Sequence, residues 1–425
     1  MAVVAHVLAR LRREPLPPAD LPIAGQVNQL CDDCQHDWRD RTLTPLVTLR
    51  LFLLQILHGN TAIAHLRQLS GLAFSPASYC EARQRLPLEV ILGLLSTLVR
   101  WANDHLRVDP RLIGSRVLVV DGSSFSTADT PQLREHFGLY PSGKPGVSYP
   151  MGKLLGLLDV ATGLFVQMLA MPALVCHDLS NVVHLHPSLR AGDILLGDRA
   201  FCSFAHFALL AGRGVFACCR LHQARKADAG GRGVRRWHKD KKPPAWMTPE
   251  QYALLPAWID VRLVSYRVNR RGFRSRQVTV ATTLLDPAAW PDGRIATLYG
   301  QRWQIETCFD HLKTTLKMNV LKCQSVQGVK KELAMYLLAY NLVRLAMLRA
   351  AVDQGVEVAR VSVIDAARWL CVCMLGLGGV ANLIVNPRRQ GRCEPRVIRG
   401  RLKAYDWMIR PRSELKAQMQ SADAH

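Results

Sequence analysis

The sequence predicts an α/β protein in which a mixed β-sheet, with helices on its faces, follows a helical N-terminal region. Three observations support this fold class. Residues 1–107 contain apolar helical patterns and nothing that resembles a strand. After Asp109-Pro110, short Val-rich runs alternate with helical segments in the order βββαβαβ. The length of 425 residues is too great for one compact core, so we expect about two to four packed units.

The N-terminal region contains four predicted helices. Gly59-Asn60 interrupts the first of them, and prolines bound the third. Helical regions of this kind bind DNA or pack against a partner, and their sequence does not choose between the two roles. The predicted helices are Leu46–Leu57, Thr61–Leu69, a segment from Ser75-Pro76 to Leu86-Pro87, and Leu88–Leu106.

The predicted sheet has five strands in its first part. Val117–Val120 is a continuous apolar run, typical of a buried strand, and it ends at Asp121-Gly122. Ala161-Thr162-Gly163 joins the next two strands as a hairpin turn. The remaining strands are Lys153–Val160, Leu164–Ala170, Asp193–Gly197 and Gly214–Cys219, with helices at Leu179–Leu185 and Phe204–Ala211.

Residues 221–290 predict a β-rich insertion. The pattern there is irregular and basic at first, and two strands then follow, at Ile259–Val268 and Phe273–Leu285. A helix is expected from Asp292 to about Lys317. Two further helices, Glu332–Ala350 and Val361–Leu375, precede about fifty residues of basic tail.

The charge of the chain indicates a polyanionic partner. Lys and Arg number 55 against 33 Asp and Glu, a net charge of +22. The stretches 220–242, 262–276 and 387–412 carry net charges of +7, +6 and +7, which is 20 of that total. In a cell such a partner is usually nucleic acid, whose phosphates Lys and Arg neutralise. A solvated basic surface is the alternative.

Composition excludes several other classes of protein. With 49% apolar and 21% charged residues, the chain is not disordered. We find no apolar run of the ~18 residues that span a bilayer, and no signal-peptide pattern, so we expect a soluble intracellular protein without a membrane partner. Twelve cysteines are an ordinary cytosolic number. No glycine-rich phosphate loop is present, so a nucleotide cofactor is not indicated.

Three carboxylates are candidate catalytic residues. Asp121 and Asp198 each follow an apolar strand, at a sheet edge where ligands gather. An Asp after a strand is also commonly a turn residue or a helix N-cap. Glu306 belongs to one face of the helix predicted from Asp292, which an ordinary amphipathic helix would turn to solvent. That face comprises Tyr299, Arg302, Glu306, Asp310 and Lys313.

Carboxylates brought together without basic neighbours repel each other, and divalent cations relieve that repulsion. Mg²⁺ takes oxygen ligands from a few carboxylates and completes its shell with water and substrate phosphate. Two such ions about 3.5–4 Å apart activate the attacking oxygen and stabilise the leaving oxygen of a phosphodiester. Arg302 and Lys313 can hold a phosphate nearby. The pattern therefore indicates metal-dependent phosphoryl transfer on DNA.

These motifs resemble those of DDE transposases of bacterial insertion sequences, specifically the large insertion-sequence family four. The segment YGQRWQIETCFDHLK meets a Tyr-x2-Arg-x3-Glu-x6-Lys signature, and VVDGSS and LLGDRAF are similar to the two Asp motifs of the family. SYCEARQRLP and GRCEPRVIRGRLKAY are similar to its N-terminal and closing segments. Ala200 departs from the pattern, because many relatives carry Gly after the Asp-Arg pair. The resemblance covers most of the chain.

The resemblance implies an RNase H-like core and cut-and-paste transposition with two Mg²⁺ ions, for which Mn²⁺ can substitute. Asp121, Asp198 and Glu306 would be the catalytic metal ligands. The partners would be double-stranded DNA, as transposon terminal inverted repeats and target DNA, and a second copy of the chain in a homodimer on paired ends. Family members often form a hairpin intermediate. We expect the protein in the bacterial cytoplasm, associated with the nucleoid.

Eight residues are expected to contact DNA. The face of the Glu306 helix would hold phosphates near the cut, one Trp of the insertion would stack on a flipped-out base, and exposed Arg pairs in the insertion and tail would bind the backbone. For the Trp, 237 and 246 are alternatives, and ordinary burial is another. The expected contacts are Tyr299, Arg302, Lys313, Trp290, Arg235, Arg236, Arg388 and Arg389.

Five regions follow from these boundaries. A host-domesticated RNase H-like nuclease and a non-catalytic DNA-binding protein derived from a transposase are the rival functions, and clustered acids facing phosphate argue against the second. The regions are a helical DNA-binding domain (1–108), the first part of the catalytic core (109–220), the β-rich insertion (221–290), the second part of the core with the Glu helix (291–350) and a helical, basic C-terminal region (351–425).

Overall fold

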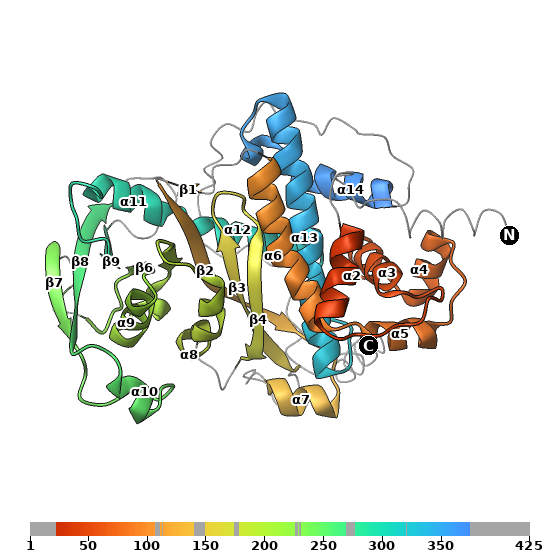
Figure 1. Ribbon diagram of the computed structural model, residues 1–425, viewed down its shortest axis with the longest axis horizontal. Helices are drawn as coiled ribbons and strands as arrows, with labels where there is room; N and C mark the ends of the chain where they lie inside the picture. The colour runs from red at the N-terminus through yellow and green to blue at the C-terminus, as the bar shows by residue number, and fades with distance from the viewer. Residues whose placement is uncertain are drawn as a thin grey trace, which may run out of the picture. The chain divides into compact units, whose positions relative to one another are not determined.

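A mixed β-sheet forms the centre of the computed structural model, and its nine described strands are shown in Figure 1. They follow the order β4-β3-β2-β5-β6-β9-β8-β7, and β1 pairs with β2 outside this path. The strands are β1 Arg111–Leu112, β2 Ser115–Ser126, β3 Met151–Asp159, β4 Phe165–Pro172, β5 Ile194–Gly197, β6 Phe216–Arg220, β7 Gly233–His238, β8 Trp258–Arg267 and β9 Gln277–Thr282.

The structure describes most of the chain between residues 23 and 374. Residues 1–266 and 278–390 belong to one compact unit. The second unit, 267–277 and 391–425, contributes to the described residues only Arg267, Val268 and Gln277, at the ends of β8 and β9. The described ranges are 23–106, 111–112, 114–139, 149–173, 178–225, 228, 231–268, 277–319 and 321–374.

Strand β2 organises the sheet. It runs antiparallel to β3, which runs antiparallel to β4, and parallel to β5, which runs parallel to β6. Three antiparallel strands in chain order, followed by two parallel strands on the other side of the first, make up an RNase H-like core. The predicted fold class, a mixed α/β sheet of RNase H-like type, is confirmed.

The expectation that the first strand ends before Asp121 was wrong. β2 continues to Ser126, because residues 118–126 all pair with β3, whereas β5 pairs only with Val117, Leu118 and Val119. The first half of β2 is buried between two neighbouring strands. The second half has a neighbour on one side only and carries polar residues, so it lacks the apolar run that marks a buried strand.

The strands between 221 and 290 extend the sheet of the core. β6 pairs with β9, and β8 and β7 complete that edge. Strand β7 was not predicted from the sequence. Its residues are exposed except for Trp237, which stacks on Phe207 of α9 with ring centroids 5.6 Å apart. A basic edge strand with one buried side chain has no recognisable alternation.

Helices cover both faces of the sheet and form a separate N-terminal bundle. Helix α6 packs against β4 and α13. Helix α2 packs against α6, and α3 packs against α13. Helices α6 and α13 therefore lie between the sheet and the bundle α2–α5 (Figure 1). The helices are α2 Ile23–Asp33, α3 Pro45–Leu57, α4 Ile63–Ser70, α5 Pro76–Arg85, α6 Leu88–His105, α7 Pro131–Phe137, α8 Asp178–Val182, α9 Phe204–Gly212, α10 Pro249–Ala253, α11 Asp292–Gly300, α12 Trp303–Asp310, α13 Val326–Gln354 and α14 Val363–Met374.

Helix α13 is long and apolar enough, by length and composition, to cross a membrane, which corrects the expectation that no segment reaches that limit. About 78% of its most apolar window is buried inside the fold. It also buries Glu332, which accepts hydrogen bonds from the backbone N–H groups of Lys322 and Cys323, and Asn341, which bonds both backbone groups of Phe165 on β4. These contacts are those of a core helix.

Gly156 on β3 allows α12 to approach the sheet. It is the register partner of Asp121, and the space above it is filled by Phe165 of β4 and Phe309 of α12, whose ring centroids lie 5.5 Å apart. A Cβ at this position would lie 2.8 Å from a ring atom of Phe165 and 3.2 Å from one of Phe309. The absence of a side chain here therefore brings α12 beside Asp121.

We expect Gly156→Ala to destabilise the protein by about 1–3 kcal/mol, because the added methyl group overpacks two ring side chains. Chemical denaturation measures the change. Gly293→Ala is the matched control, since nothing lies within 4 Å of a Cβ built there, and it should be neutral or slightly stabilising in α11. Equal effects of the two substitutions would show that the approach at Gly156 does not constrain the packing.

Candidate active site

Asp121 lies on β2, and Asp198 directly follows the neighbouring parallel strand β5. Because β2 and β5 are paired in register, the two residues occupy equivalent positions just beyond the last pair of that ladder. Asp121 Oδ1 accepts a 2.8 Å hydrogen bond from the N–H of Gly122, and Asp198 Oδ1 accepts one of 2.7 Å from the N–H of Ala200. Asp198 also caps the short 3₁₀ turn η2 (Arg199–Phe201). It is therefore a capping residue as well as a candidate catalytic carboxylate.

The continuous helix predicted from Asp292 to Lys317 was wrong. Helix α11 ends at Gly300, and the N–H groups of Gln301 and Arg302 donate to carbonyls three residues earlier, so the helix tightens before α12 begins. After α12 the chain forms a π-helical turn, η4 (His311–Thr315). Gly at the junction weakens the helix there. The π turn changes the angular position of Lys313 relative to Glu306.

Arg302 joins two of the three predicted catalytic carboxylates. Its Nη1 lies 3.3 Å from Oδ2 of Asp121, and its Nη2 lies 2.8 Å from Oε1 of Glu306. Arg302 is 8% exposed, and its guanidinium lies 5.9 Å from the ring centroid of Tyr299 and 4.9 Å from that of Trp303. Its Nε is buried without a hydrogen-bond partner. One buried cation therefore holds β2 and α12 together at this point.

The electrostatics of Asp121 depend on both other carboxylates. The pKa of Asp121 is raised to about 6, mainly by burial and to a smaller extent by the negative charges of Asp198 and Glu306. The hydrogen bond from Gly122 and the charge of Arg302 oppose this rise without cancelling it. Asp121 therefore lies in an environment where its ionised form is disfavoured, although one cation is already in contact with it.

The described residues contain no group of three or more His, Cys, Asp or Glu side chains placed to hold a metal ion. The donor chemistry nevertheless fits a divalent cation. Asp121, Asp198 and Glu306 offer carboxylate oxygens, which Mg²⁺ prefers, and burial together with the charges of Asp198 and Glu306 keeps the pKa of Asp121 raised although Arg302 is in contact with it. Arg302 occupies the space between two of these donors.

Comparison with known proteins identifies the family. Residues 113–342, more than half of the chain and all three carboxylates, match the family model described as the transposase DDE domain. The chain belongs to the DDE transposase family. It is 24% identical over 363 residues to the transposase InsG for insertion sequence element IS4 of Escherichia coli strain K12, covering 78% of each chain. The assignment to the IS4 family, made from the motifs, is confirmed.

Among solved structures, the chain is similar to the piggyBac transposase in a cryo-EM structure of its synaptic complex with hairpin DNA. The TM-score is 0.44 and the identity 10%, over 87% of this chain and 80% of that chain. Transposases of the DDE family cleave DNA and generally use divalent metal ions.

The other members of the signature lie around Arg302. Tyr299 is almost fully buried, so its ring supports the guanidinium from the side of α11. Lys313 is half-buried, which lowers the pKa of its ammonium group, and within the described residues it has neither an ion pair nor a hydrogen bond. Their roles at DNA phosphates stay predictions.

The predicted DNA contacts of the insertion and tail differ in their surroundings. In the transposase, the guanidinium of Arg294 covers one face of the Trp290 ring, with its Cζ 4.4 Å from the ring centroid. That face of the ring is therefore occupied. Arg236 pairs with Asp260 at 3.0 Å and covers the ring of Trp258. Arg235 is exposed on β7 and has no such partner among the described residues. Arg388 and Arg389 lie outside the described residues.

A buried histidine pair supports the turn that carries Asp198, and sequence analysis did not find it. Nδ1 of His206 lies 2.8 Å from the carbonyl oxygen of Phe201, and its Nε2 lies 3.2 Å from Nε2 of His186. Burial lowers the pKa of His206 to about 4 and that of His186 to about 3, so both rings are neutral at pH 7. His206 then donates to Phe201 and accepts from His186.

The raised pKa of Asp121 predicts a stability that depends on pH. Its folded value of about 6 lies above the ordinary 3.8, so the folded protein binds the proton more tightly and gains stability as the pH falls through 6 toward 4. At pH 8, Asp121→Asn should be more stable than the wild type by roughly 1–3 kcal/mol. The advantage should shrink toward pH 4.

Thermal melting of both proteins from pH 4 to pH 8 in a metal chelator measures this difference. Asp310→Asn, which changes an exposed carboxylate at the end of α12, is the control for removal of a charge. A variant that is less stable than the wild type at pH 8, or a difference independent of pH, would contradict the account of Asp121.

Proposed function

We propose that this transposase carries out metal-dependent cut-and-paste DNA transposition, with Asp121, Asp198 and Glu306 as the catalytic metal ligands. The observation that carries the proposal is the contact of Asp121 and Glu306 with one buried guanidinium, next to a third carboxylate whose charge raises the pKa of Asp121. Such clustering destabilises a fold when no cation balances it. It has a clear use when the substrate is a phosphodiester that requires divalent ions.

The expected ions are two Mg²⁺, with Mn²⁺ able to substitute, and when bound they would supply an activated oxygen nucleophile and neutralise charge on the phosphate. The three carboxylates would hold them. Asp121 and Asp198 each use one oxygen in a backbone hydrogen bond, which fixes the direction of the other oxygen. The hydrogen bonds that hold the ligands thus come from the backbone of Gly122 in β2 and of Ala200 in η2.

Arg302 has two successive roles in this proposal. In the metal-free protein it keeps Asp121 and Glu306 together. With DNA present, its planar guanidinium can turn from a carboxylate to a phosphate, which it binds with similar fork geometry. Lys313, which has no partner among the described residues, would add a second positive charge at that phosphate.

The partners of the proposed reaction are double-stranded DNA bearing the terminal inverted repeats, target DNA, and a second copy of the chain on the paired end. The reaction would take place in the cytoplasm at the bacterial nucleoid. A domesticated nuclease or a DNA-binding protein without activity would share the fold, and the match to the transposase family does not favour either.

Cleavage of an end-bearing DNA duplex in Mg²⁺ tests the proposed ligands. Asp121→Asn, Asp198→Asn and Glu306→Gln should each reduce cleavage by about 1,000-fold or more, because each removes an anionic ligand with little change of shape. Binding of the same duplex in a chelator should persist. Asp310→Asn is the matched control on α12 and should cleave as the wild type does.

A variant of the three that retains cleavage is not a catalytic ligand. If Asp310→Asn loses cleavage and Glu306→Gln retains it, the third metal ligand is Asp310 and not Glu306.

Two neighbouring arginines on β7 test how the basic insertion contacts DNA. Arg235→Ala should weaken duplex binding and reduce the slope of log K against log salt concentration by about 0.9, the value for one phosphate contact. Arg236→Ala should change the slope little, because Asp260 and Trp258 already engage Arg236. Salt titrations from about 50 to 200 mM measure both slopes. Equal slopes for both variants would mean that Arg236 contacts DNA despite its ion pair with Asp260.

A further inference from the structure

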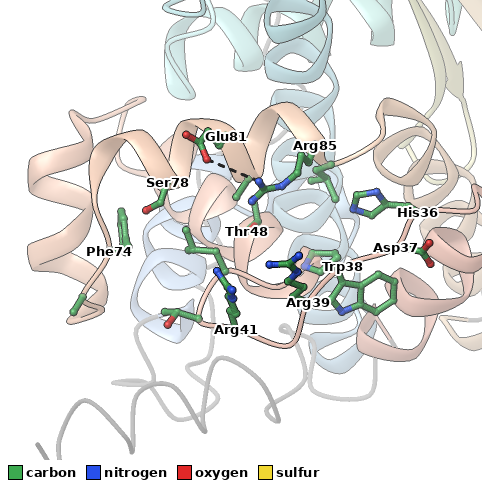
Figure 2. Close-up of a pocket in the computed structure, with 16 residues that line it drawn as sticks. His36, Asp37, Trp38, Arg39, Arg41, Thr48, Phe74, Ser78, Glu81 and Arg85 are labelled. Atoms are coloured by element: carbon green, nitrogen blue, oxygen red, sulfur yellow. Dashed lines mark ion pairs between the residues drawn. The ribbon is translucent and has the colours of Figure 1, made fainter.

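A cavity lies in the N-terminal bundle, away from Asp121, Asp198 and Glu306. Its volume is about 620 Å³, within the range of about 300–1,000 Å³ that is usual for ligand sites. One wall is the loop between α2 and α3, and the other is formed by the start of α3, the segment before α5, and α5 itself (Figure 2). Helices α6 and α13 separate this bundle from the sheet (Figure 1).

Three guanidinium groups line this cavity. Arg39 and Arg41 come from the loop and Arg85 comes from α5 on the opposite wall, whereas Asp37 and Glu81 are the acidic lining residues (Figure 2). The pair between Arg85 and Glu81 is long, at 3.9 Å, and both side chains are about two-thirds exposed, at 65% and 63%. An ion pair of this kind contributes little and is readily exchanged for a stronger anion.

An aromatic side chain lies next to these arginines. Trp38 is 37% exposed, which is unusual for the largest apolar side chain, and it directly precedes Arg39 in the loop. Its ring stacks on His36 with centroids 6.2 Å apart and an interplanar angle of 25°, which orients the ring at the cavity. Buried Phe74 forms part of the other wall. The cavity thus offers positive charge and a flat apolar surface together.

We propose that this cavity binds an unpaired nucleotide of a DNA strand, with the base against Trp38 and the adjoining phosphates on Arg39 and Arg85. Basic grooves with aromatic side chains are the usual sites for single strands, because every base has a face that can stack. A duplex, in contrast, is contacted by elements that project into its grooves, not by a cavity of the size of one nucleotide. The inference deepens the proposed function, since it concerns how DNA is held outside the cut site.

Photo-crosslinking tests this site in the full-length protein. An oligothymidylate carrying 5-iodouracil is irradiated with the protein in a chelator, and the attached peptide is identified by mass spectrometry. The crosslink is expected in the loop between α2 and α3, at Trp38. An unmodified single strand should compete for it more strongly than a duplex of the same length. Attachment elsewhere, or equal competition by the duplex, would overturn the proposal.

Binding measurements on variants provide an independent readout. Trp38→Ala should weaken binding of the single strand by about 5- to 30-fold, and Trp38→Phe should restore most of it, because an aromatic face is retained. Arg39→Ala should reduce the salt slope by about 0.7, the single-strand value for one phosphate. Arg100→Ala on α6, an exposed residue outside the cavity, removes one charge as the matched control.

Wild-type affinity in both Trp38→Ala and Arg39→Ala, with unchanged melting temperatures, would also overturn the site. An acidic peptide that displaces the oligonucleotide at lower concentration than a single strand does would assign the cavity to a protein partner instead. Because these assays contain no divalent ion, their result does not depend on whether Asp121, Asp198 and Glu306 catalyse cleavage.

Discussion

The arrangement of the candidate site depends on one buried guanidinium between two carboxylates. Arg302 contacts Asp121 on β2 and Glu306 on α12, two segments that are 185 residues apart in the sequence. Without this cation, Asp121 would be a mostly buried carboxylate close to two others, at a cost that grows as water is excluded. Burial, together with the charges of Asp198 and Glu306, keeps the pKa of Asp121 raised even with Arg302 present. The site is therefore assembled, but the ionised form of Asp121 is still disfavoured there.

The sheet and the helices supply the geometry that this charge arrangement needs. Parallel pairing of β2 with β5 places Asp121 and Asp198 at equivalent positions, and antiparallel pairing with β3 places Gly156 beside Asp121. The missing side chain at Gly156 admits Phe309, which brings Glu306 into reach. His206 supports the turn that Asp198 caps. Packing and backbone hydrogen bonds thus position the carboxylates in addition to the ion pairs of Arg302.

Much of the core could be predicted because its signals are local. The apolar run Val117–Val120 indicates a strand within four residues, and the spacing of Arg302 and Glu306 indicates a helical face within one turn. The order of the elements predicted a mixed sheet with helices on its faces, and the resemblance of the motifs implied its RNase H-like type. The division into five regions and the catalytic roles of the site residues stay predictions.

The features that sequence analysis missed depend on distant partners. The second half of β2 is polar and becomes a strand only because β3 pairs with it. Strand β7 depends on β8 and on the burial of Trp237 against α9. The bond between His186 and His206 joins residues twenty apart that have no shared pattern. The π turn after Asp310 shifts Lys313 in a way that regular helical spacing does not express.

The most direct test of the account is anomalous diffraction from crystals of the wild-type protein soaked with Mn²⁺. We expect an anomalous peak in contact with carboxylate oxygens of Asp121, Asp198 and Glu306, with the guanidinium of Arg302 moved away from Asp121. A peak at other residues, or a fully occupied Mn²⁺ with Arg302 still paired to both Asp121 and Glu306, would contradict it.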